Sequence, residues 1–462
     1  MESQKISPTG DSAGPSEVQS SAQHPWALLW FIGLALLTFG LDVTLLNSSL
    51  PTVASVLNAS PEEIQWFAGA YTLAVAATLP LAGLIGDHGH SKRVLSLSLG
   101  GFTIANASVL LISTSWHLII LRVFQGIFSA FILALAIALV ARTFQGNDRT
   151  KALSLAALTS TIGIPLGPFL GGTIIAFLDF RWVFVVNIPF AIAALFGVLF
   201  LTPKDHDCRP LRTGMFPYVF GFGLLALTWG TVKAGRELNF LSGSAILAGT
   251  GIIVLGILVA LRGKTTVLPQ SVLKLSSFRH GAMAIFVTAM IMIAVIFIAP
   301  QYFAFIWAWR PLQIALGLTP AIISLVIGTR LAVPLNNLLK TRIIFTLGFV
   351  LIFTGCLLFS LMGDAPNWAV LTTWSFPLGL GLGILLPLAM DLSLKEVDSR
   401  NFGSASAAIQ ATRQVGGTLG VAIFGSLVNA ASFFTSGSRP FSLGFIGLAI
   451  IAAMAALWSL RI

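Results

Sequence analysis

The chain has 462 residues, of which 56% are hydrophobic and only 9% are charged, and its mean hydropathy is +0.92. A water-soluble protein of this length needs far more polar side chains to cover its surface. The composition therefore excludes a soluble enzyme or binding domain and predicts a protein that crosses a membrane many times.

Apolar stretches long enough to span a bilayer recur along the whole chain after residue 25. They are too long, and alternate too little, to be barrel strands, so we expect an all-α integral membrane protein. We predict fourteen transmembrane helices at 26–50, 65–85, 94–112, 117–140, 152–177, 182–201, 215–232, 241–261, 281–305, 312–335, 343–363, 368–390, 402–428 and 441–460.

The longest polar interruptions between these stretches lie at 202–214 and 262–280. They divide the chain into two six-helix bundles joined by an inserted helical hairpin. Residues 1–25 are polar and rich in Ser, Pro and Gln, which predicts a disordered cytoplasmic tail. The expected domains are this tail, an N-terminal bundle at 26–201, the hairpin with its flanking cytoplasmic loops at 202–280, and a C-terminal bundle at 281–462.

The net charge of +10 reflects membrane topology rather than a nucleic-acid partner. With both termini placed in the cytoplasm, most Lys and Arg residues fall in inner loops and tails, which is the positive-inside pattern. The clearest examples are Lys92, Arg93, Arg142, Arg149 and Lys151. We expect a multi-pass protein of the cytoplasmic membrane.

Asp42 is the only one of the sixteen acidic residues that lies deep in a predicted span. A carboxylate at the bilayer centre costs about 2.5–3.5 kcal/mol on insertion scales, so it is retained where it faces a partner or a cavity. Two interpretations are open: a carboxylate that loads and releases a proton as access alternates, or a structural polar contact.

Arg122 is the candidate partner of Asp42. At about 1.5 Å of rise per residue, Asp42 lies roughly 12 Å and Arg122 roughly 8 Å below the outer boundary, within one helical turn in depth. An arginine at that depth would hold the carboxylate ionised. The alternative is that Arg122 extends to the outer interface.

Two motifs suggest moving parts. The segment "GLIGDHGHSKR" comes after the second span and combines Gly83 and Asp87 with Lys92 and Arg93, which predicts either a latch on the inner face or a plain polar turn. The segment "GIPLGPFLGG" in the fifth span predicts a gate or an ordinary tight helix contact, because closely spaced small residues let helix backbones approach. Its residues are Gly163, Gly167, Pro168, Gly171 and Gly172.

Polar residues also interrupt the second half. Gln410 and Arg413 lie three residues apart in the thirteenth predicted span, and Asp391 lies nearer the inner end of the twelfth. We find no acid at the depth of Arg413. It is a candidate to bind an anionic group, to structure its half or to reach backbone carbonyls.

Enzyme chemistry is not predicted. Six His and two Cys, with no pair of embedded carboxylates, give no pattern for a metal site or a nucleophile. No G-x-x-x-x-G-K-[ST] loop is present to bind ATP. We therefore expect no metal and no cofactor.

The motifs together resemble the fourteen-span drug:proton antiporters of the major facilitator superfamily, over essentially everything after residue 25. "LDVTLLNSSLP" resembles the first-helix motif at Asp42, and "RVFQG" the fourth-helix motif at Arg122, Gln125 and Gly126. "GLIGDHGHSKR" resembles the loop after helix two, "GIPLGPFLGG" resembles the antiporter motif of helix five, and "RWVFVVNIP" resembles the family's segment on the C-terminal side of that motif. The resemblance to the helix-five motif implies an exporter.

The sequence thus predicts a proton-coupled antiporter that exports small amphipathic, cationic compounds by alternating access and works as a monomer. Asp42 would carry the proton and Arg122 would regulate it, while Gln125, Gln410, Arg413 and Asp391 are candidate substrate contacts. Export of a physiological metabolite or lipid is the alternative, and a non-transporting receptor on the same fold is a more distant one.

Overall fold

A computed structural model describes residues 24–87, 91–144, 146–202, 216–235, 240–261, 270–398 and 402–461. The predicted tail therefore lies outside the described residues except for its last two. The helices are α1 (Pro25–Leu45), α2 (Leu50–Val56), α3 (Pro61–Asp87), α4 (Ser91–Ser108), α5 (Ser115–Thr143), α6 (Gly146–Phe177), α7 (Trp182–Val185), α8 (Asn187–Leu201), α9 (Phe216–Ala234), α10 (Phe240–Leu261), α11 (Gln270–Lys274), α12 (Ser276–Phe305), α13 (Pro311–Leu338), α14 (Thr341–Ser360), α15 (Trp368–Leu394), α16 (Phe402–Ser432) and α17 (Arg439–Ser459), with short 3-10 turns η1 (Asn47–Ser49) and η2 (Val109–Leu111).

The described part of the chain contains eleven helical segments that are long and apolar enough to cross a membrane. The helices α6, α9 and α10 are not among these eleven, although they have 32, 19 and 22 residues. The all-helical membrane fold is as predicted, whereas the count of fourteen spans stays a prediction.

The helices before α9 and those after α11 repeat one packing scheme. In the first half α1 packs against α6, α3 against α5, and α4 against α5 and α8. In the second half α12 packs against α16, α13 against α15, and α14 against α15 and α17. Each pair in one half thus has its counterpart in the other.

Close backbone approaches reproduce this repeat residue by residue. A Cβ atom on Gly126 would meet the backbone oxygen of Tyr71 and the side chain of Ala74. Gly379 meets the backbone oxygen of Ala321 and the side chain of Ser324 in the same way. At both positions the neighbouring helix lies too close for a Cβ atom, so Gly126 of the first half corresponds to Gly379 of the second.

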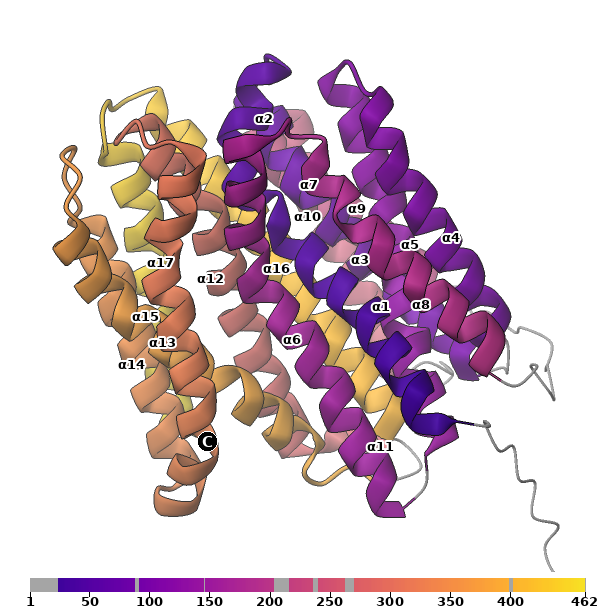
Figure 1. Cartoon of the computed structure of the whole chain (residues 1–462). Coiled ribbons are helices and arrows are strands. Elements are labelled where there is room, and N and C mark those ends of the chain that lie inside the picture. The colour runs from indigo at the N-terminus through magenta and orange to yellow at the C-terminus, as the bar shows by residue number, and fades with distance from the viewer. Residues whose placement is uncertain are drawn as a thin grey trace, which may run out of the picture.

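The halves meet along two helix pairs, α3 with α16 and α6 with α13. In Figure 1, α6 and α13 lie side by side at the end where α2 lies and diverge toward the other end. At the near end a Cβ on Gly172 of α6 would lie 2.8 Å from the carbonyl oxygen of Pro311. The parts η1 and α2 also contact α12 there, so these contacts close this end of the molecule.

The helix α9 binds to both halves, and α10 packs on α9. Lys233 of α9 pairs with Glu62 of α3 at 3.1 Å. The Ser426 hydroxyl of α16 lies 2.9 Å from the carbonyl oxygen of Thr231 in α9 and 3.3 Å from Oε1 of Gln65 in α3.

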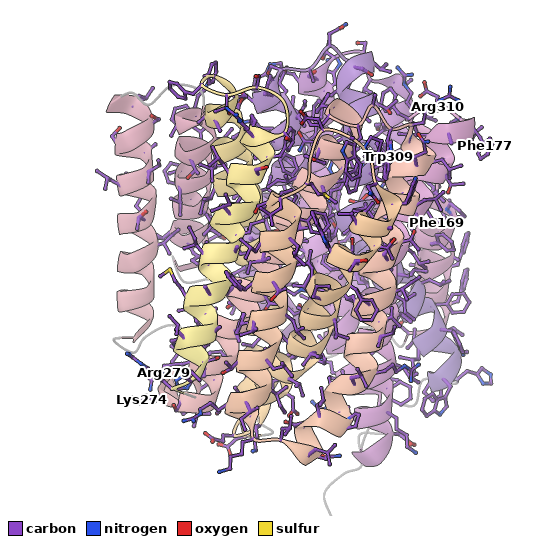
Figure 2. The ribbon with its side chains drawn as sticks, turned by 90° about the vertical axis from the view of Figure 1, so that its left-hand side faces the viewer. Phe169, Phe177, Lys274, Arg279, Trp309 and Arg310 are labelled. Atoms are coloured by element: carbon purple, nitrogen blue, oxygen red, sulfur yellow. The ribbon has the colours of Figure 1, made fainter. Side chains whose placement is uncertain are left out.

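The two ends of the molecule carry different side chains. Figure 2 shows Lys274 and Arg279 at the end opposite Trp309 and Arg310. The marked C-terminus and the beginning of α1 also lie at one end, the lower end of Figure 1.

Candidate functional site

The deep aspartate and the deep arginine of the first half form an ion pair. Arg122 Nη1 of α5 lies 2.9 Å from Asp42 Oδ2 of α1. Asp42 is 2% exposed and Arg122 is 1% exposed. Two opposite charges withdrawn from water stabilise each other strongly, and each one alone would be costly to bury.

The remaining donors of Arg122 are also used. Nε donates to the carbonyl oxygen of Phe67 at 3.1 Å, and Nη2 to the carbonyl oxygen of Asp42 at 3.4 Å. Nη1 donates in addition to Oε1 of Gln125 at 3.1 Å. The guanidinium lies 4.3 Å from the ring centroid of Tyr71, a cation–π geometry. The arginine is therefore fixed by α1, α3 and its own helix, and does not extend to the interface.

The second carboxylate oxygen of Asp42 has its own partner. Asn187 Nδ2, at the beginning of α8, donates to Asp42 Oδ1 at 3.1 Å. Gln125 Nε2 in turn donates to Asn106 Oδ1 of α4 at 3.2 Å. The carboxylate itself contacts side chains of α5 and α8, and Arg122 and Gln125 extend the network to α3 and α4, so that five helices of one half are joined through it.

The second half lacks this network at the equivalent positions. A Cβ on Gly167 would lie 3.0 Å from the carbonyl oxygen of Leu41, and a Cβ on Gly420 would likewise meet the carbonyl oxygen of Met290. Leu41 of the first half therefore corresponds to Met290 of the second. Asp42, the residue after Leu41, corresponds to Ile291, the residue after Met290. Arg122 lies four residues before Gly126, and Ser375 lies four residues before its counterpart Gly379. Among these aligned positions, the acid and the arginine belong to the first half alone.

The helix-five motif makes two kinds of contact. A Cβ on Gly163 would lie 2.8 Å from the carbonyl oxygen of Leu37, and Gly167 and Gly171 likewise face α1. Gly172 instead faces α13 of the other half. The glycine stripe is thus a tight contact within the first half, and its last member lies between the halves. Pro168 is buried beside the stripe.

The predicted latch is described only in part. Gly83 faces Ala407 of α16, where a Cβ would lie 3.8 Å from the Ala407 Cβ. Lys92 Nζ donates to the carbonyl oxygen of Thr202. Arg93 lies in α4, and the side chain of Asp87 lies outside the described residues, so the latch stays a prediction.

The predicted polar residues of the second half do not form a cluster with the ion pair. Gln410 and Arg413 lie on α16 and are partly exposed, and Asp391 is exposed near the end of α15. Arg413 has no hydrogen bond or ion pair with any residue that the structure describes. Gln414, its neighbour, has a buried Nε2 without a hydrogen-bond partner among the described residues.

Three members of the network were not predicted as site residues: Asn187, Asn106 and Tyr71. Uncharged polar and aromatic residues are common in membrane helices, so their occurrence alone does not mark a site. Asn187 lies in "RWVFVVNIP", a segment that the sequence already marks as similar to the antiporter family, and that was the available signal.

Comparison with known proteins assigns the class. Residues 32–420 match the Major Facilitator Superfamily, and the chain belongs to this family of membrane transporters. It is a transporter rather than an enzyme.

Relatives share about a quarter of their residues with this chain over most of its length. It is 25% identical to the tetracenomycin C resistance and export protein of Streptomyces glaucescens, covering 88% of this chain and 76% of that protein. It is 25% identical to the multidrug efflux pump LfrA of Mycolicibacterium smegmatis, over 90% of this chain and 83% of that protein. For the methylenomycin A resistance protein of Bacillus subtilis the identity is 24%, with 95% of each chain covered.

Solved structures share the fold. A mutant of the nucleoside transporter NupG superposes with a TM-score of 0.65 at 13% identity, covering 94% of this chain and 99% of that one. A bacterial homologue of the human lysosomal transporter Spinster gives a TM-score of 0.66 at 12% identity, with 97% of each chain covered.

Proposed function

We propose that this protein exports small amphipathic compounds across the cytoplasmic membrane in exchange for protons, by alternating access between its two halves. The observation that carries the proposal is the buried carboxylate of Asp42, held by Arg122 and Asn187 in a network that joins five helices. A proton that binds there cancels one charge of the pair, which changes the balance of contacts in the whole half. The names of the relatives support export as the direction.

In this proposal fourteen helices cross the membrane, α1, α3–α6, α8–α10 and α12–α17, and the protein works as a monomer. The domains follow the predicted boundaries 26–201, 202–280 and 281–462. The termini and the end with Lys274 and Arg279 face the cytoplasm, in keeping with the positive-inside rule. Gly172 belongs to the gate between the halves.

An inward-moving proton supplies about 2.3 kcal/mol for every 100 mV of membrane potential, apart from any pH gradient. For an uncharged substrate that amount is enough to concentrate it by more than tenfold per proton. A monovalent cation that leaves in exchange for one proton moves no net charge, so its export would be driven by the pH gradient.

The test measures the uptake of dyes into energised inside-out vesicles. Ethidium represents the cationic substrates that the sequence predicts, and anionic and uncharged dyes are tested alongside it. We expect the wild type to concentrate at least one dye, and both Asp42→Asn and a protonophore to abolish this. Asp148→Asn is the matched control, because it removes an exposed carboxylate that lies outside the network and pairs with Lys151 in the first turns of α6. Accumulation by Asp42→Asn at the wild-type level refutes the role of Asp42, and a wild type that moves none of the dyes refutes export of such compounds.

A further inference from the structure

We propose that Arg413 and Gln410 of α16 bind an acidic group, such as a carboxylate, on the compound that the protein transports. This inference rests on the proposed function, and it names the chemical class of the substrate. It differs from the cationic substrates that the sequence predicts.

The first observation is the lack of a partner for Arg413 among the described residues. The four described carboxylates of the second half are engaged or placed elsewhere. Glu396 accepts from Ser277, and Asp364 accepts from the backbone of Ser438. Asp391 is exposed near the end of α15, and Asp398 is exposed beyond it. In the first half, by contrast, every charge-bearing nitrogen of the buried Arg122 has an acceptor. A charge kept deep in a membrane helix without a partner marks a functional position.

The second observation is the direction in which Arg413 projects. Residues three, four and seven positions further on lie on the same face of a helix. At these positions Gly416, Gly417 and Gly420 all face α12, where an added Cβ atom would meet Phe286, Ile293 and Met290. Arg413 therefore projects toward α12. The side of α16 that faces Gly69 of α3, marked by Val421, lies about a quarter-turn away.

The third observation is the set of donors around it. Gln410 lies three residues before Arg413 on the same face of α16, and carries an amide that donates hydrogen bonds. Gln414 Nε2 is a further buried donor without an acceptor in the described part of the chain. An arginine offers a planar fork that matches a carboxylate through two parallel hydrogen bonds. A carboxylate on a bound compound would supply the acceptors that the guanidinium lacks among the described residues.

Asp42, the acidic residue that lies deep in a described span, offers no comparable site for a cation. The carboxylate of Asp42 has Arg122 on one oxygen and Asn187 on the other. A cationic substrate would have to displace an arginine to reach it. The electrostatics of the described spans therefore favour an acidic group at Arg413 over a basic group at Asp42.

The test measures how tightly 1-naphthoate and 1-naphthamide bind to the purified full chain in lipid nanodiscs, with tryptophan fluorescence as the readout. The two compounds have nearly the same shape and differ in charge. We expect the wild type to bind naphthoate at least about tenfold more tightly than naphthamide, because hydrogen bonds to a charged group are strong. Arg413→Met should remove this preference and leave naphthamide binding unchanged. Arg330→Met is the matched control, since Arg330 is an exposed arginine on another span of the same half, and should keep the preference.

A second measurement separates a binding role from a structural one. An arginine that supports the fold stabilises it, whereas an unpaired arginine kept for a ligand costs stability. We therefore expect Arg413→Met to raise the unfolding midpoint of the ligand-free protein. A lowered midpoint, a preference that survives in Arg413→Met, or a wild type that binds both compounds equally overturns the proposal.

The two proposals fail separately. If vesicles export no dye while naphthoate still binds through Arg413, the proposed function is wrong and the anion site stands. If export is found but naphthoate binding shows no dependence on Arg413, the anion site is wrong and the exporter stands.

Discussion

The ion pair between Asp42 and Arg122 gives the most quantitative prediction. Removing one partner of a buried pair costs about 3–5 kcal/mol, because the other charge remains buried without compensation. In Asp42→Asn, Arg122 keeps the carbonyl of Phe67, the side chain of Gln125 and the ring of Tyr71, so we expect the lower end of this range.

In Arg122→Gln the carboxylate keeps only the amide of Asn187, so we expect a loss near 5 kcal/mol. The double variant, Asp42→Asn with Arg122→Gln, leaves no buried charge. It should therefore be destabilised less than Arg122→Gln alone, although it has lost more native groups.

The assay is unfolding of the purified protein in mixed micelles by added SDS, followed by tryptophan fluorescence. Lys233→Gln is the control, because Lys233 is 41% exposed in its pair with Glu62 and should cost below about 1 kcal/mol. If the double variant equals the sum of the two single variants within about 0.5 kcal/mol, the two residues do not interact energetically and the reasoning fails.

Two further predictions use the same assay. Gly163→Ala places a methyl group 2.8 Å from the backbone of α1, which should cost about 1–3 kcal/mol, whereas Gly100→Ala, with open space around it, should be neutral or gain up to about 1 kcal/mol. Equal effects of these two substitutions would contradict the tight contact. Asn187→Leu leaves one oxygen of the Asp42 carboxylate without a donor and should cost about 1–3 kcal/mol, and a neutral result would mean that Asn187 does not hold the carboxylate.

The sequence allowed the central pair to be predicted because charges are expensive inside a membrane. Asp42 is alone among the acids at that depth, and the rise of a helix placed Arg122 within a turn of it. The division into two helix bundles was predicted from the long polar interruptions at 202–214 and 262–280.

The surroundings of the pair could not be predicted in the same way. Which face of α3 or α8 turns toward α1 depends on packing among several helices, so Tyr71 and Asn187 gave no signal of their depth or direction. The role of the glycine stripe was ambiguous for a related reason. Spacing predicts that a helix is approached closely, but it does not say whether the approaching helix is α1 of the same half or α13 of the other.

The hydroxyl of Ser426 in α16 lies within hydrogen-bond distance of Gln65 in α3 and of the carbonyl oxygen of Thr231 in α9. This one atom therefore contacts the first half and the inserted helix α9 as well as belonging to the second half. A rotation of one half against the other that keeps these contacts would need an axis close to this serine. Under such a rotation the atoms near Ser426 would move little, and the far ends of the helices would move much more.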